Sequence, residues 1–328
     1  MTSLAPLLQM FFTDRLIRQR RASPNTVAAY RDTFRLLLGY THEQTGKQPA
    51  ELNVSDLDAT LITEFLDHLE HQRHNSIRTR NARLAAIHSL FRCAALHHPE
   101  HALVIQRVLA IQDKRGDRTI IAFLTPDEID ALLASPNRST WIGRRDHALL
   151  YVAIQTGLRV SELTGLQHDD VELGAGAHIR CLGKGRKQRC TPLTSQTVTV
   201  LRTWLDEHGD FASPLFPSSR RTSLSRDAVG RLVTRHTVTA RSTCPSLNTK
   251  SVTPHVLRHT CAMQLLHAGV DTSVIALWLG HESPKTTQIY LHADLALKEQ
   301  ALARTTPPDV TPGRYTPPDA VLAFLESL

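Results

Sequence analysis

Apolar residues follow a helical spacing along most of this chain, and the spacing changes over one short stretch. In "SPNTVAAYRDTFRLLLGY", residues 23–40, the apolar side chains recur every three or four positions, behind an N-cap serine and a first-turn proline. The same spacing returns in residues 55–70 and 75–97. We therefore expect residues 1–112 to form a compact, all-helical domain.

The pattern changes after residue 112. The stretch "QDKRGDRTII" combines glycine with charges of both signs and has no helical period, which is typical of a linker, here placed at residues 113–122. The next helix begins with a capping box, "TPDE", formed by Thr125 and Glu128. A long buried helix should then end at Gly157.

The change of period itself lies in "AHIRCLGKGRKQRCTPL", residues 177–193. Two short strand-like runs flank a turn rich in glycine and lysine, which predicts a β-hairpin, and helical spacing resumes afterwards. The expected fold is therefore mainly α with a small antiparallel β-sheet or hairpin. A length of 328 residues fits two domains, the second at residues 123–304.

Residues 305–328 differ from the rest of the chain. They contain "TPPD" twice and end in "AVLAFLESL", which reads as a proline-rich spacer and a short amphipathic helix. A helix of that length gains little by folding alone. We expect it to dock on another copy of the protein, as an element exchanged between protomers.

Charge and cysteine content limit the class of protein. Lys and Arg total 38 against 31 Asp and Glu, and arginine carries most of the excess, so a polyanionic partner such as nucleic acid is plausible. The five cysteines include no CxxC pair, which fits a reducing cytoplasm better than a disulfide framework. No apolar run approaches the ~20 residues of a membrane span, so we expect a soluble, cytoplasmic protein without a membrane partner.

Two basic stretches raise the question of anion binding. "HVLRH" places His255, Arg258 and His259 at the start of a predicted helix, either as a solvated helix end or as donors aimed at one anion. The two histidines also have the spacing of a zinc pair, but no HExxH glutamate accompanies them and the arginine would repel the ion, so we expect no metal. A second group, Arg78, Arg80 and Arg83, opens a helix without interleaved acids and suits either a solvated face or phosphate contact.

Several motifs occur in a telling order: "TGLRVSEL" with Arg159, "LGKGRKQR" with Lys184, "HVLRH", and "LGHESPKTTQIYLH" with His281 and Tyr290. In this order and these local contexts they resemble the tyrosine recombinases of the phage-integrase type. The resemblance covers the second domain, and the helical first domain is similar to the family's core-DNA-binding region. It implies an enzyme that cleaves and rejoins DNA strands through a 3′-phosphotyrosyl intermediate, without metal, ATP or another cofactor.

The resemblance also implies roles for individual side chains. Arg159 and Arg258 would bind the non-bridging oxygens of a phosphodiester, where transition-state charge gathers. His255 would accept the proton of Tyr290, whose hydroxyl otherwise has a pKa of ~10. Tyr290 would attack phosphorus.

The remaining roles concern proton return, donation and DNA contact. Lys184 would return a proton to the leaving 5′ oxygen, and His281 would donate a hydrogen bond. Glu162 is best interpreted as a partner that orients an arginine. Arg186 and Lys187, on the same hairpin turn as Lys184, are expected to contact DNA.

The expected partner is double-stranded DNA with an inverted-repeat core site, bound by a tetramer that holds two such sites. Phage integration, resolution of chromosome dimers and transposition of a mobile element remain open as biological roles. Two alternative functions also remain open: a type IB topoisomerase, which would religate its own strand, and a DNA-binding regulator that has lost activity on the same scaffold. The intact set of site residues argues against the regulator.

Overall fold

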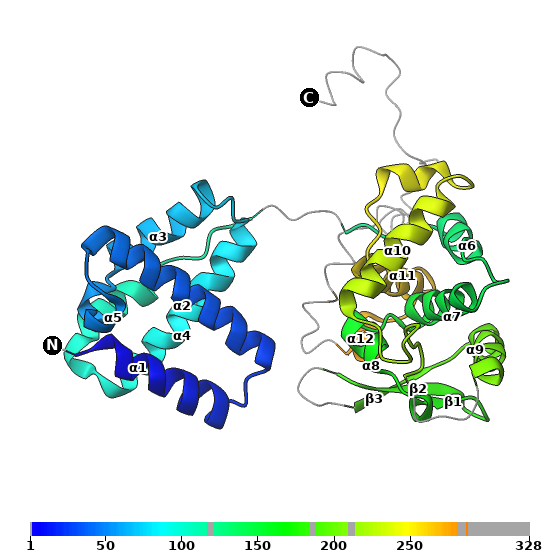
Figure 1. Cartoon of the computed structure of the whole chain (residues 1–328), viewed down its shortest axis with the longest axis horizontal. Coiled ribbons are helices and arrows are strands. Elements are labelled where there is room, and N and C mark those ends of the chain that lie inside the picture. The colour runs from blue at the N-terminus through cyan, green and yellow to red at the C-terminus, as the bar shows by residue number, and fades with distance from the viewer. Residues whose placement is uncertain (1, 117–120, 184–187, 209–213, 281–286, 288–328) are drawn as a thin grey trace, which may run out of the picture. The chain divides into compact units, whose positions relative to one another are not determined.

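The computed structural model describes residues 2–116, 121–183, 188–208, 214–280 and 287. The chain divides into two compact units, Met1–Arg118 and Thr119–Leu328 (Figure 1). Each unit has its own hydrophobic core, so each is described by itself. No helix in the described part of the chain combines the length and the apolar composition that crossing a bilayer requires.

The first unit is helical throughout its described residues. Its helices are α1 (Leu4–Met10), the π-helical η1 (Phe11–Gln19), α2 (Pro24–Thr45), α3 (Ala59–His71), α4 (Ile77–His97) and α5 (Ala102–Leu109), with 3-10 turns at Pro49–Glu51, Val54–Asp56 and Pro99–His101. Side-chain caps begin three of them: Ser23 accepts from the Thr26 amide, Asp58 from Leu61 and Ser76 from Thr79. Its core is built mainly from leucine side chains, with Phe11, Phe34, Phe65 and Phe91 packed among them.

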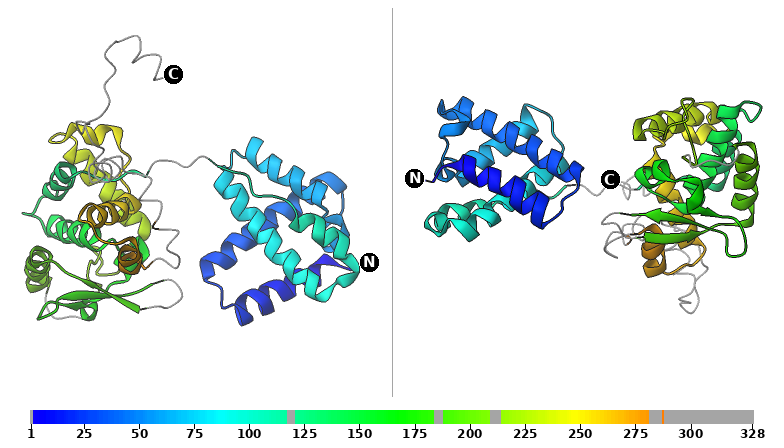
Figure 2. Two further views of the ribbon diagram at one scale, coloured as in Figure 1. Left: turned by 180° about the vertical axis from the view of Figure 1, so that it is seen from behind. Right: turned by 60° about the horizontal axis from the view of Figure 1, so that its bottom comes forward.

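The second unit combines helices with one small sheet. Its elements are α6 (Pro126–Ala134), α7 (Trp141–Thr156), α8 (Val160–Gly165), η5 (His168–Asp170), β1 (Val171–Glu172), β2 (His178–Leu182), β3 (Gln188–Pro192), α9 (Ser195–His208), α10 (Arg226–Ala240), η7 (Pro245–Thr249), α11 (Pro254–His267) and α12 (Thr272–Leu279). The sheet is antiparallel in the order β1-β2-β3, with Ile179 opposite both Val171 and Thr191. Figure 2 shows the sheet along one side of the helices.

The expected fold class is confirmed: the protein is mainly helical with a small antiparallel sheet. The predicted hairpin corresponds to β2 and β3, and the Thr125–Glu128 capping box is present. Strand β1 and helix α9 were not predicted. β1 has two residues and no readable alternation, and the early part of α9, "SQTVTV", is rich in β-branched residues that disfavour a helix.

The C-terminal end of α7 packs closely against α11 and α12 in the second unit. Gly157 ends α7 in the left-handed region, at φ 62°, as the sequence predicts. A Cβ at this position would lie 2.7 Å from Cδ2 of Leu279 and 3.0 Å from Sγ of Cys261. The end of α7 is therefore packed directly against both α11 and α12, and any side chain there would separate them.

Candidate active site

Arg159 lies between α7 and α8 as the N-cap residue of α8. Its backbone amide donates to Oε2 of Glu162 at 2.7 Å, and its Nη1 donates to Oε1 of the same carboxylate at 2.8 Å. Its Nη2 donates to the carbonyl of Gly280 at 2.8 Å. The side chain is 31% exposed, so a guanidinium fixed on one side still faces solvent on the other.

Arg258 comes from α11, whose N-cap is Thr253, with the Thr253 side chain accepting from the Val256 amide. Its guanidinium is buried and spans two helix ends: Nη1 donates to the carbonyl of Gly157 at 2.6 Å, and Nη2 donates to the carbonyl of Leu279 at 2.7 Å. The tight packing at Gly157 therefore sets the position of this guanidinium as well as that of α7.

A third arginine, Arg189 on β3, joins the same group. Its Nη1 and Nη2 donate to the two oxygens of Glu162 at 3.0 Å and 2.8 Å, and its Nε donates to the carbonyl of Trp278 at 3.1 Å. Arg189 was not among the site residues predicted from the sequence. Strand alternation was the available signal, because Arg189 lies on the same face of β3 as the buried Thr191.

The three arginines share one structural target, the C-terminal end of α12. The consecutive carbonyls of Trp278, Leu279 and Gly280 accept hydrogen bonds from Arg189, Arg258 and Arg159 respectively. The last carbonyls of a helix lack partners within the helix and carry its partial negative charge. Three guanidiniums thus satisfy this helix end and converge on it from β3, α11 and the start of α8.

Glu162 is the acid at the centre of this group. Its side chain is 3% exposed, and although burial favours the neutral acid, the hydrogen bonds from Arg189 and Arg159 bring the pKa of Glu162 below its usual value. The carboxylate is therefore ionised at neutral pH. The guanidiniums of Arg159 and Arg189 bond to this carboxylate, and that of Arg258 bonds to the Leu279 carbonyl of the same helix end. Among the described residues of this group, three positive charges therefore face one negative charge, and the excess suits an anionic ligand.

The two histidines of "HVLRH" lie together at the start of α11. The rings of His255 and His259 are 4.5 Å apart between centroids and nearly perpendicular, at 65°. Burial, the neighbouring His255 and Arg258 lower the pKa of His259 to about 4, so this ring is neutral at neutral pH. In the part of the chain that the structure describes, no three His, Cys, Asp or Glu side chains are grouped to hold a metal ion.

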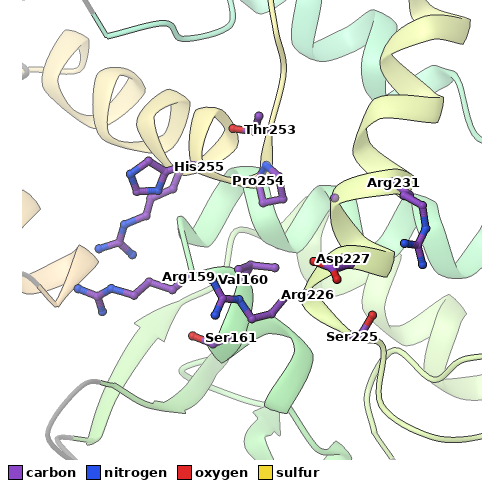
Figure 3. A pocket seen from close by; sticks show the side chains of 12 residues that line it. Arg159, Val160, Ser161, Ser225, Arg226, Asp227, Arg231, Thr253, Pro254 and His255 are labelled. Atoms are coloured by element: carbon purple, nitrogen blue, oxygen red, sulfur yellow. The ribbon is translucent and has the colours of Figure 1, made fainter. Parts of the chain in front are cut away.

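An open cleft of about 910 Å³ passes over these residues. Arg159, His255 and Arg258 line it at one end, and Arg226 and Arg231 line it where α10 begins. Figure 3 shows Arg159, His255 and Arg226 reaching the cleft from three different elements. Four arginines therefore line the cleft together with one acidic residue, Asp227, so its basic surface extends beyond the site of a single anion.

The other predicted residues of this site lie outside the described residues. They are Lys184, Arg186 and Lys187 of the hairpin turn, together with His281 and Tyr290. The structure does describe the residues that flank these segments. β2 ends at Leu182, β3 begins at Gln188, and Gly280, at φ 64°, caps the C-terminal end of α12 as the residue before His281.

The three arginines at the start of α4 differ in their exposure to solvent. Arg78 is exposed, as phosphate contact requires. Arg80 instead is 3% exposed and donates to the carbonyl of Gln112 at 3.1 Å, so its guanidinium is bound within the first unit, and its contact with DNA stays a prediction. Arg83 is half-buried, and burial, followed by the charge of Arg73, lowers its pKa.

Family models match both units of the chain. The model of the phage integrase family matches residues 122–296, and the model of the phage integrase N-terminal SAM-like domain matches residues 11–98. A putative integrase/recombinase of Sinorhizobium fredii is 57% identical over 99% of this chain and 98% of its own length. The tyrosine recombinase XerC of Pelobacter propionicus is 33% identical over 94% of this chain and 99% of its own length.

Solved structures agree in fold. The Tn1549 transposon integrase in complex with circular intermediate DNA has a TM-score of 0.69 at 17% identity, covering 94% of this chain and 100% of that one. The XerH site-specific recombinase bound to its palindromic difH substrate has a TM-score of 0.68 at 23% identity, covering 87% and 81%. At these identities the likeness concerns the arrangement of elements.

Proposed function

The chain belongs to the phage integrase family of tyrosine recombinases, and on that premise we propose that it cleaves and rejoins DNA at specific sites through a 3′-phosphotyrosyl intermediate. The observation that carries the proposal is the placement of Arg159 and Arg258 in one basic cleft, both fixed by helix-end carbonyls. Such fixed cations need no rearrangement when charge develops on a phosphate.

The two arginines would act on the scissile phosphate. A phosphodiester repels nucleophiles through its negative oxygens, and the transfer transition state concentrates further charge on them. The forks of Arg159 and Arg258 suit the two non-bridging oxygens, since guanidinium donors match phosphate geometry. Glu162 would keep the fork of Arg159 aimed at the phosphate.

Proton transfer would involve residues on both sides of the phosphate. His255 would take the proton from Tyr290 as the phenol oxygen attacks phosphorus, and Lys184 would protonate the departing 5′ oxygen. His281 would donate a hydrogen bond to the phosphate. The covalent phosphotyrosine retains the energy of the broken bond, so rejoining would require neither metal nor ATP.

The DNA would follow the basic surface away from the scissile phosphate. Arg226 and Arg231 extend the cleft along α10 and would contact neighbouring phosphates. In the first unit, Arg78 and Arg83 would do the same, and Arg186 and Lys187 would reach DNA from the hairpin turn. Residues 1–112 would then act as a core-DNA-binding domain, residues 123–304 as the catalytic domain and residues 113–122 as their linker.

We further infer an assembly of four copies on two inverted-repeat core sites, with residues 305–328 exchanged between neighbouring protomers. The similarity to a putative integrase/recombinase and to a transposon integrase supports integration, resolution or transposition of a mobile element as the role. Two partner duplexes must be present at once for strand transfer between them, which is the physical reason for a multi-subunit complex.

A nicked duplex that releases a short fragment on cleavage tests the proposal. The duplex is one selected for binding from a random pool and then nicked beside the cleavage position, so that the released strand diffuses away. Wild-type protein should accumulate a covalent adduct on the 3′ phosphate, and Tyr290→Phe should form none. Tight binding without any adduct would support a DNA-binding regulator, and relaxation of supercoils without strand exchange would support a topoisomerase.

A further inference from the structure

Arg189 has no role in the proposed reaction, yet it bonds to Glu162 and to the end of α12, as the phosphate-binding Arg159 does. Its side chain is 13% exposed and its three nitrogens all donate hydrogen bonds, two to Glu162 and one to the carbonyl of Trp278. Burying a guanidinium costs desolvation free energy, and hydrogen bonds to this many acceptors fix its orientation.

We propose that Arg189 is a positioning residue for strand cleavage: it holds the carboxylate that orients Arg159 and, at the same time, the helix end that precedes His281. The inference rests on the proposed function and deepens it. Arg189 touches neither phosphate nor nucleophile in this account and acts through the groups that do.

The first link runs through Glu162. The carboxylate receives Arg189 as a two-pronged pair, which fixes both of its oxygens in one plane. The same two oxygens accept from Nη1 and the backbone amide of Arg159. A carboxylate held on one side by a buried fork leaves Arg159 one orientation instead of several, and that orientation directs its third contact to Gly280.

The second link runs through α12. Nε of Arg189 bonds the Trp278 carbonyl, while Gly280 packs so closely on the guanidinium that a Cβ there would lie 2.8 Å from Nη1. Arg189 therefore contacts the last turn of α12 and the residue immediately before His281. Moving this guanidinium would shift the point at which the chain carrying His281 and Tyr290 leaves the helix.

The third link is closeness along the chain. Arg189 is the second residue of β3, the strand that follows the hairpin turn with Lys184. One side chain thus joins the base of that turn to Glu162 and to α12. Arg189 therefore contacts or adjoins the chain segments that carry three predicted site residues: the general acid Lys184, the phosphate-binding Arg159 and the nucleophile Tyr290. It thereby controls the distances between them, and a displacement near 1 Å in such a site costs on the order of 100-fold in rate.

The matched substitution is Arg189→Lys, which keeps the positive charge and loses the two-pronged contact. With wild type forming the adduct on the nicked duplex, Arg189→Lys should slow adduct formation at saturating protein by about 10- to 100-fold while its Kd for the duplex stays within about twofold. Arg145→Lys is the control, because Arg145 is also buried, also bonds a carboxylate, Asp146, and a carbonyl, Pro217, and lies at the other end of α7. It should cleave at the wild-type rate despite a similar loss of thermal stability.

A double variant separates positioning from general destabilisation. Because Arg189 acts in part through Glu162, adding Arg189→Lys to Glu162→Gln should slow cleavage by less than the product of the two single effects, and a full product would overturn the link through Glu162. Should Arg189→Lys not fold, Gly280→Ala displaces the same guanidinium from the opposite side and should slow cleavage with Kd preserved. Wild-type cleavage by Arg189→Lys, or a loss confined to DNA affinity, would overturn the inference, whereas absence of an adduct from wild type would overturn the proposed function instead.

Discussion

Glu162 is the residue on which the arginine group depends, because four hydrogen bonds from Arg159 and Arg189 end on its two oxygens. We predict that Glu162→Gln lowers the free energy of unfolding by about 3 kcal/mol, since it leaves two guanidiniums without their counter-charge in a largely buried place. The same change should slow cleavage, because Arg159 loses its orientation. Denaturant unfolding and adduct formation measure the two effects.

The control for Glu162 is Glu207→Gln. Glu207 also receives a guanidinium, that of Arg144, but both side chains are about one-third exposed. Water and salt screen such a pair, so its loss should barely change stability or cleavage. Equal behaviour of the two variants would contradict the central place given to Glu162.

His259 gives the site a pH dependence of known sign. Its pKa is about 4 in the folded protein and ~6.5 in an unfolded chain, so on acidification the unfolded chain binds a proton first. The stability contributed by neutral His259 is therefore complete above about pH 6.5 and is lost as the pH falls toward 4. We predict that His259→Gln makes the free energy of unfolding less dependent on pH in this window, by a total on the order of 2 kcal/mol, which is less than the full pKa shift would give because the ring is only partly buried and solvent screens its charge. Urea unfolding at a series of pH values measures it, and parallel curves for both proteins would refute it.

At the scale of elements, the helix ends hold the site together more than the helix bodies do. The end of α7 supplies the Gly157 carbonyl to Arg258 and packs on Leu279 without room for a side chain. We predict that Gly157→Ala costs about 3 kcal/mol or more of stability and also slows cleavage, because it combines left-handed strain with displacement of α12.

Gly269→Ala is the matched comparison for Gly157→Ala. Gly269 has a φ of 81°, but no atom lies within 4 Å of an added Cβ. Gly269→Ala should therefore lower the free energy of unfolding only through left-handed backbone strain, by about 1–2 kcal/mol, and leave cleavage unchanged. Equal losses in thermal or denaturant unfolding would show that packing at Gly157 contributes nothing.

Several of these elements could be predicted from the sequence because their signals are local. Ser23, Thr125 and Gly157 each act within one helical turn, and the hairpin is signalled by its turn. Helix α9 could not be predicted in this way. Its β-branched start disfavours a helix, and burial of Leu201 and Trp204 against the rest of the unit decides its structure.

The site shows the same division between local and distant information. Motif order was enough to predict that Arg159, His255 and Arg258 belong together, and all three line one cleft. Arg189 was missed because its partner Glu162 lies 27 residues away. Arg80 was assigned to DNA because the run of arginines opens a helix without interleaved acids, whereas the carbonyl that binds it, that of Gln112, lies 32 residues later.

At the scale of the whole molecule, DNA binding should draw on arginines from both units. We predict that Arg78→Ala and Arg231→Ala each reduce the slope of log K against log salt by about 0.9, since each contact with phosphate releases condensed counterions. Both residues are exposed, as contact requires. Fluorescence anisotropy of a labelled duplex over a range of salt concentrations measures the slope.

Arg144→Ala serves as the comparison for salt dependence. Its guanidinium is bonded to Glu207 and to the carbonyl of Arg138, so no change of slope is expected. If Arg78→Ala and Arg231→Ala also left the slope unchanged, these two residues would be removed from the DNA interface.

In the proposed function, Arg159 and Arg258 bind one DNA phosphate. A structure of Tyr290→Phe bound to an uncut duplex tests this most directly, because the substitution leaves the phosphate in place. We predict that the two non-bridging oxygens of the scissile phosphate lie within hydrogen-bonding distance, about 3 Å, of the guanidiniums of Arg159 and Arg258, with the ring of residue 290 facing the same phosphorus. A duplex whose phosphates all lie well away from both guanidiniums would contradict the account.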